Sequence, residues 1–166
     1  MACHKAGVMK MGDGLFIKTA ADVAKNYPDI EYTEEQIDTV CMKLANNPSE
    51  FDVMVMPNLY GDIVSDLCAG LIGGLGLTAS GNIGKDCEVY EAVHGTAPDI
   101  AGKNLANPTA LLLSSTMMLK NMGLTSYGQN IENSMMKVME EGKWLTGDVG
   151  GKATTTQYTQ AIIDNL

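Results

Sequence analysis

Short apolar runs alternate with longer stretches of helical periodicity along this chain of 166 residues. The run FDVMVMP, from residue 51, is apolar and bounded by turn residues, which predicts a buried strand. The segments IEYTE (30–34) and CEVYEAV (87–93) predict further strands. Apolar residues with helical spacing fill the stretches 13–26, 34–46, 62–72, 109–122, 126–142 and 153–165. Such alternation indicates an α/β fold in which helices cover a sheet.

A cluster of glycines follows the helix predicted at 62–72. Gly73, Gly74 and Gly76 end that helix, and two more glycines, at 81 and 84, extend the stretch into a predicted loop. Domain boundaries fall in such glycine-rich segments. We therefore expect a hinge between two domains at this point.

The overall charge excludes some classes of partner. The formal net charge is −9 and the pI is near 4.5, which argues against nucleic acid and anionic membranes as ligands. No apolar run is long enough to cross a bilayer, and MACHKAGVMK has neither the apolar core of a signal peptide nor an Arg-rich bias.

The cysteines lie far apart with no C-x-x-C pair, which indicates reduced thiols in an intracellular protein; they are Cys3, Cys41, Cys68 and Cys87.

All 11 basic residues of the chain are lysines. A site for a small polycarboxylate normally uses the planar, two-pronged guanidinium of arginine. If the chain acts on such a substrate, part of the substrate site must come from elsewhere.

Two aspartates stand four residues apart in DIVSD. On a helix, Asp62 and Asp66 project from the same face, and we expect both in the first turn, where the helix dipole stabilises negative charge. With Asp38, they would form an all-oxygen site suited to Mg²⁺ or Mn²⁺. The alternative is that they are solvated capping acids.

Lys5 is a candidate general acid or base if it is desolvated near other charges, and otherwise a surface lysine.

The chain lacks a convincing G-x-G-x-x-G after a strand, because GLIGGLG follows a helix, so the Rossmann interpretation fails. The segment HGTAPDIAGKNLANP instead predicts a polar loop from a strand end to a helix start. Backbone amides freed in such a loop can hold phosphate oxygens. His94 could contact a base, and the Asp99 carboxylate could accept both ribose hydroxyls while repelling a 2′-phosphate. A plain surface loop is the alternative.

Several of these segments occur together in one order and spacing: HKAGVMK, DGLF, IDTVCM, FDVMVMPNLYGDIVSDLCAGLIGGLG, HGTAPDIAGKNLANPTALLLSS and the late GG-A-TTT-Y run. Together they resemble the isocitrate/isopropylmalate dehydrogenase family of metal-dependent β-decarboxylating dehydrogenases. Within it, they are most similar to the catalytic-type subunits of the NAD-dependent isocitrate dehydrogenases. The resemblance implies that family's α/β fold, which is not a Rossmann fold.

The resemblance implies a role for each candidate residue. Asp62 and Asp66 would bind Mg²⁺ or Mn²⁺ in one protomer, and Asp38 would complete the site from the neighbouring protomer. Lys5 would also cross the dimer interface and relay a proton. The residues that match the adenosine-binding loop are His94, Gly95, Thr96, Ala97, Asp99, Ile100 and Asn107, and Asn58 would lie near cofactor and metal. In that loop Asp-Ile goes with NAD, whereas NADP-dependent relatives carry Lys-Tyr.

The implied reaction is the metal-assisted, NAD-dependent oxidative decarboxylation of isocitrate to 2-oxoglutarate, a step of the tricarboxylic acid cycle. The implied assembly is a homo- or hetero-oligomer with active sites shared across a dimer, in the mitochondrial matrix, or in the cytoplasm if the source is prokaryotic. Isopropylmalate dehydrogenase is an alternative, although its loop more often reads HGSAPDIAG and it lacks MKMGDGLF. Two further alternatives to the implied function are a non-catalytic subunit and an inactive truncated product.

Members of this family are about twice as long as this chain. By the resemblance, residues 1–72 would be part of the small, dimer-forming and metal-binding domain, and residues 73–166 part of the large, NAD-binding domain. The substrate-binding arginines and a tyrosine acid would lie outside the chain. We therefore expect this segment alone to expose apolar edges and to be less than fully active. Gly7 departs from the family, which usually has Asn there.

Overall fold

The computed structural model describes residues 1–166 as two separate units, Met1–Leu71 and Ile72–Leu166. The division falls at the end of a helix, beside the glycines expected to form a hinge. Which functional domain each unit belongs to remains a prediction. None of the helices combines the length and apolar character required to span a membrane.

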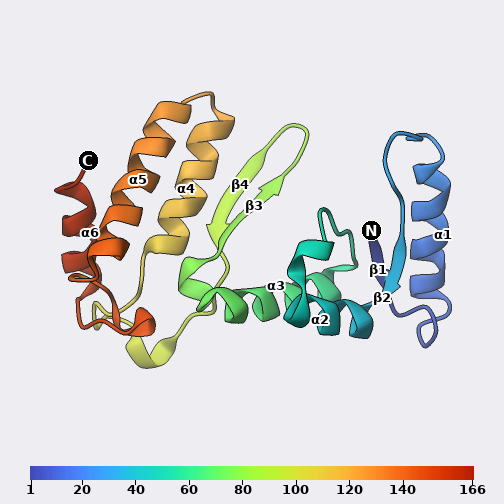
Figure 1. Ribbon diagram of the computed structural model, residues 1–166, viewed down its shortest axis with the longest axis horizontal. Coiled ribbons are helices and arrows are strands. Elements are labelled where there is room, and N and C mark those ends of the chain that lie inside the picture. Colours follow the sequence, from blue (N-terminus) through green and yellow to red (C-terminus); the bar gives the residue numbers. More distant parts are fainter. The chain divides into compact units, whose positions relative to one another are not determined.

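The first unit is built from short strands and three helices (Figure 1): β1 (Ala2–His4), α1 (Gly12–Ala24), β2 (Glu34–Gln36), α2 (Ile37–Asn46), the 3₁₀ turn Pro48–Glu50 and α3 (Asn58–Ile72). β1 and β2 pair in parallel. The core packs one strand residue, Cys3, against Val40 and Leu44 of α2 and Val64 of α3. Apolar residues at helical spacing therefore direct α2 and α3 onto β1.

The predicted buried strand at FDVMVMP is wrong. This segment runs beside β1, where Val55 N donates to Met1 O (3.0 Å) and Cys3 N donates to Val55 O (2.9 Å). It forms only an isolated bridge with Ala2, and Val53 is 70% exposed. A buried strand needs neighbours on both edges and both faces, and here β1 is the only strand beside it.

Two other boundaries also differ from the sequence prediction. The strand expected at 30–34 lies at Glu34–Gln36, so α2 begins at Ile37 rather than at residue 34. Residues 79–83 are not a loop, because β3 (Ala79–Ile83) forms an antiparallel hairpin with β4 (Glu88–Ala92), and Gly84 lies in the turn between them. β3 has little apolar character of its own, so its pairing with β4, which the sequence did predict, determines its conformation.

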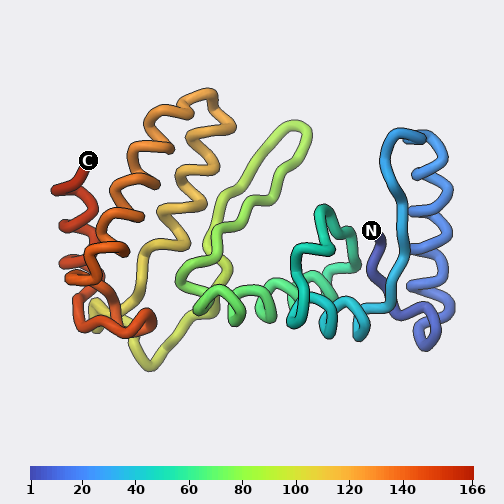
Figure 2. Tube along the Cα trace, viewed as in Figure 1, coloured from blue at the N-terminus to red at the C-terminus, as the bar shows by residue number.

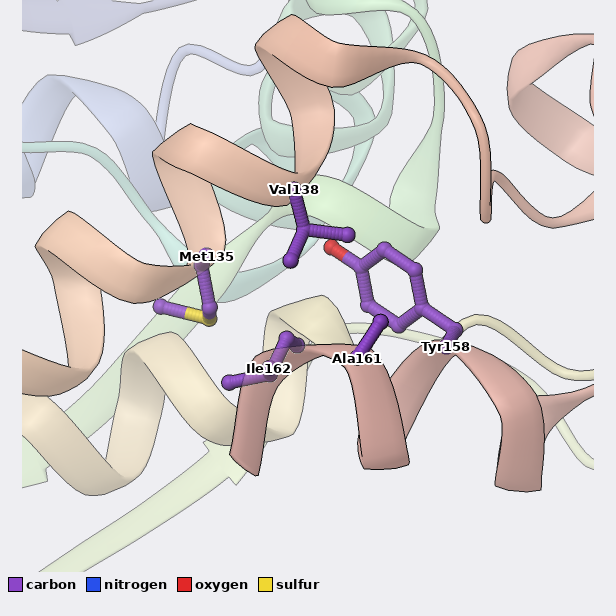
Figure 3. Close-up of a cluster of buried hydrophobic side chains, with 5 residues drawn as sticks. All are labelled: Met135, Val138, Tyr158, Ala161 and Ile162. Atoms are coloured by element: carbon purple, nitrogen blue, oxygen red, sulfur yellow. The ribbon is translucent and has the colours of Figure 1, made fainter. Parts of the chain in front are cut away.

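In the second unit, the hairpin, α4 (Thr109–Asn121), α5 (Thr125–Glu141) and α6 (Thr155–Ile163) lie side by side (Figure 2). These helices are close to those predicted. The core lies between α5 and α6, where Tyr158, Ala161 and Ile162 face Met135 and Val138 (Figure 3). The remaining elements are the 3₁₀ turns Leu75–Leu77, Pro98–Ile100 and Gly147–Val149.

Candidate active site

Lys5 and Asp38 form an ion pair in the first unit. Lys5 directly follows β1, and Asp38 is the second residue of α2, so the pairing of β1 with β2 brings them together. The distance from Lys5 Nζ to Asp38 Oδ2 is 2.7 Å, and the two side chains are 27% and 64% exposed. The hydrogen bond from Lys5 lowers the pKa of Asp38, which keeps its carboxylate ionised. The structure thus joins a predicted proton relay to a predicted metal ligand.

Asp62 and Asp66 lie on α3, one turn apart and exposed. They are not in its first turn, as the sequence had predicted, because α3 begins at Asn58 and includes the NLYG segment. The helix dipole therefore does not offset the repulsion between the two carboxylates. Neither aspartate takes part in the ion pairs of this chain.

These two carboxylates fit a hard divalent cation. Both present free oxygen atoms on one helix face, and Mg²⁺ and Mn²⁺ prefer such ligands. No group of three or more potential ligands forms within the chain, so Asp38 does not join Asp62 and Asp66 in one protomer. The expected completion of the site by a neighbouring protomer remains a prediction.

The loop between β4 and α4 carries the residues predicted to bind adenosine. His94, Asp99 and their neighbours are exposed, with His94 Nδ1 2.9 Å from Gly95 O. Ala97 has a φ of 40°, in the left-handed region that a residue with a Cβ seldom occupies. Backbone strain of this kind is frequent at ligand-binding sites. Asn58 belongs to the first unit and is exposed at the start of α3.

Asn107, at the end of this loop, is held on both ends of its side-chain amide. Its Oδ1 accepts from Thr109 N (3.0 Å) and Thr109 Oγ1 (2.6 Å), and its Nδ2 donates to Asp148 (2.9 Å). Thr109 Oγ1 is 2.7 Å from the buried hydroxyl of Tyr158, and Thr146 donates to Asp148. Burial raises the pKa of Tyr158, so this hydroxyl stays protonated. The orientation of Asn107 is therefore fixed by the protein itself.

The start of α6 holds the preceding part of the loop. Asn104 has a φ of 58°, and its Oδ1 accepts from the N (3.2 Å) and Oγ1 (3.1 Å) of Thr156. Thr155 N donates to Asn104 O (2.9 Å), and Thr155 Oγ1 donates to Ala106 O. Residues 104–107 are thus attached to α6, about fifty residues further along the chain.

The family profile described as isocitrate/isopropylmalate dehydrogenase matches residues 1–166. The chain belongs to this family. The fold expected from the resemblance is confirmed, since isocitrate dehydrogenase from Methylococcus capsulatus matches 99% of this chain, and 49% of its own, with a TM-score of 0.92 and 45% identity. The TT0538 protein from Thermus thermophilus matches 99% of this chain, and 34% of its own, with a TM-score of 0.94 and 46% identity.

Curated family members of similar sequence include both catalytic and regulatory chains. "Isocitrate dehydrogenase [NAD] catalytic subunit 5, mitochondrial" of Arabidopsis thaliana is 58% identical over 99% of this chain and 44% of its own length. A mitochondrial NAD isocitrate dehydrogenase chain of Dictyostelium discoideum, which is named a regulatory subunit, is 57% identical over 98% of this chain and 46% of its own length. The chain spans less than half the length of these relatives.

Sequence reasoning missed two residues in contact with the predicted site. Asp13, in DGLF, is buried and accepts hydrogen bonds from Lys5 N and Tyr60 Oη. Asp148 orients Asn107. Neither carries a local signal, because their partners lie 8, 47 and 41 residues away. A further supporting residue, Asn104, does carry a local signal, since asparagine tolerates the left-handed backbone conformation better than most residues.

Proposed function

We propose that the complete protein containing this chain catalyses the oxidative decarboxylation of isocitrate to 2-oxoglutarate with NAD and Mg²⁺ or Mn²⁺. This is a step of the tricarboxylic acid cycle. We further propose that it acts in the mitochondrial matrix as part of an oligomer whose active sites are shared across a dimer. Relatives with 57–58% identity bear the names of mitochondrial NAD-dependent isocitrate dehydrogenase subunits, which supports this assignment.

The observation that carries the proposal is the ion pair between Lys5 and Asp38, at 2.7 Å. Both residues were predicted to act in the site of the neighbouring protomer. Two side chains that reach the same site from one chain have to lie close together in that chain. Asp38 would hold the Lys5 ammonium in place, so that Nζ can pass a proton to or from the substrate. Its carboxylate would also complete the metal site of the neighbouring protomer.

The other residues have binding roles. Asp62 and Asp66 would hold the divalent cation, which when bound acts as a Lewis acid on substrate oxygen atoms. Asp99 would accept hydrogen bonds from the adenosine ribose, and His94 would contact the base. The NAD held by their loop would supply the acceptor for the hydride that leaves the alcohol carbon. Asn58 is proposed to lie near both ligands.

The test is Asp62→Asn in the complete protein. We expect loss of Mn²⁺-dependent NADH formation from isocitrate, with the circular dichroism spectrum unchanged, because the amide provides a weaker ligand than the carboxylate. Asp29→Asn is the matched control, since Asp29 is also an exposed aspartate of the first unit; it should keep full activity. Unchanged turnover in Asp62→Asn would refute the assignment.

A non-catalytic subunit is the second candidate, because one relative with 57% identity is named a regulatory subunit. In that case the complete protein would produce no NADH alone, but would change the activity of a catalytic partner chain. Measuring NADH formation by the complete protein with and without such a partner separates these two functions.

A further inference from the structure

Asp13 is the only buried residue of the chain with an ionisable carboxyl group, and its exposure is 7%. Burying a carboxylate is unfavourable unless hydrogen bonds compensate for the lost water. Both of its hydrogen bonds end on the same oxygen: Lys5 N donates to Oδ2 at 2.6 Å, and Tyr60 Oη donates to it at 2.8 Å. No lysine pairs with it. Its partners are therefore the main chain at Lys5 and a side chain of α3.

The main chain around Lys5 is fixed from several directions. Lys5 O accepts from Val8 N (2.9 Å) and Met9 N (2.8 Å), and Asp13 N donates to Met9 O (3.0 Å). With the bond from Lys5 N to Asp13, both main-chain polar groups of Lys5 are occupied. The Nζ atom is held separately by Asp38. Asp13 is the only side chain that binds the Lys5 backbone.

Tyr60 links the same carboxylate to the helix that carries Asp62 and Asp66. It stands in the first turn of α3, and its hydrogen bond to Asp13 raises the pKa of Tyr60, so the hydroxyl remains a donor at neutral pH. One oxygen atom thus connects the segment of the predicted proton relay to the predicted metal-binding helix.

We propose that Asp13 is a positioning residue, which fixes Lys5 relative to α3 through its two hydrogen bonds. The inference rests on the proposed function for its effect on turnover. Since one oxygen accepts both bonds, an asparagine carbonyl at this position can replace it. An alanine cannot.

The experiment compares Asp13→Ala, Asp13→Asn and Tyr60→Phe with the wild type, all in the complete protein. In Asp13→Ala we expect kcat to fall on the order of 10- to 100-fold, the effect of a misplaced catalytic group, while KM for isocitrate changes less than about threefold. Asp13→Asn should recover kcat to within about threefold. Tyr60→Phe keeps the bond to Lys5 but breaks the link to α3, so it should lower kcat by about three- to tenfold. If Asp13→Ala does not fold, Asp13→Ser replaces it, since a serine hydroxyl is too short to reach both donors.

Hydrogen exchange provides a measurement that does not depend on activity. The Lys5 amide should exchange at least about tenfold faster in Asp13→Ala than in the wild type and in Asp13→Asn. Unchanged exchange in Asp13→Ala, or a loss of kcat that Asp13→Asn shares, overturns the proposal. If the wild type forms no NADH from isocitrate, the proposed function fails, and the exchange rates alone decide whether Asp13 fixes Lys5.

Discussion

We expect cofactor choice to depend on two neighbouring residues, Asp99 and Ile100, in the exposed loop after β4. As proposed, the carboxylate at position 99 would accept hydrogen bonds from the ribose hydroxyls of NAD and would repel the 2′-phosphate of NADP. We predict that Asp99→Lys combined with Ile100→Tyr, in the complete protein, lowers kcat/KM for NAD relative to NADP by about tenfold or more. Steady-state rates with each cofactor measure this ratio. A preference that does not change would show that the loop does not bind adenosine as proposed.

Two adjacent methionines allow the effect of a core substitution on stability to be compared with that of a surface substitution. Met135 is 1% exposed and packs against α6, whereas Met136 is 56% exposed. Met135→Ala should destabilise the protein by about 2–5 kcal/mol, because it removes buried apolar atoms and leaves a cavity. Met136→Ala should change the stability by less than about 0.5 kcal/mol. Urea denaturation of both variants tests this, and equal midpoints would contradict the observed core.

At the level of single residues, the sequence predicted the candidate site residues but not the residues that hold them through hydrogen bonds. The resemblance identified Lys5 and Asp38, and the structure places them in contact. The burial of Asp13 could not be predicted, because an acidic residue in the first turn of a helix is usually solvated. In the fold it accepts a hydrogen bond from Tyr60, which is distant in sequence.

At the level of elements, the start of α6 carries a helix cap and also binds the loop that is proposed to hold NAD. Thr154 caps the helix, accepting from Gln157 N, while the Gln157 side chain accepts from Thr154 N. Thr154→Ala should therefore destabilise the protein by about 1 kcal/mol. Since α6 also holds the loop through Asn104, we expect weaker NAD binding as well. Thr125→Ala is the control, because no side-chain cap stabilises the start of α5.

Thermal denaturation and NAD titration of the Thr154 variant check both effects. A melting temperature equal to that of the wild type would show that the cap contributes nothing.

Helices were predicted better than strands because helical periodicity is local, whereas a strand depends on its neighbours. Residues 126–142 and 153–165 were expected as helices, and α5 and α6 lie there. FDVMVMP has the composition of a buried strand, yet it finds only β1 beside it. β3 has glycine and asparagine in its centre, so its own residues do not indicate a strand. Its pairing with β4 could not be inferred from the pattern of β3 alone.

At the level of the whole molecule, large apolar side chains remain at the surface of both units. Val8 and Val53 are each 70% exposed, Met11 is 89% exposed, and Leu111 of α4 is 55% exposed. We expect some of these side chains to be covered by further protein in the complete molecule, because exposed apolar surface commonly serves as a contact surface. This agrees with a chain that spans less than half the length of its relatives and with a proposed oligomer.

The proposal of a site shared between protomers has a direct test in mixed dimers of the complete protein. Asp38→Asn and Asp62→Asn should each be inactive alone. In a dimer with one variant chain of each kind, one site receives Asp62 and Asp66 from the first chain and Asp38 from the second. Random mixing should then restore about a quarter of the wild-type rate of NADH formation. No recovery in mixed dimers that are shown to form would contradict a site built from both protomers.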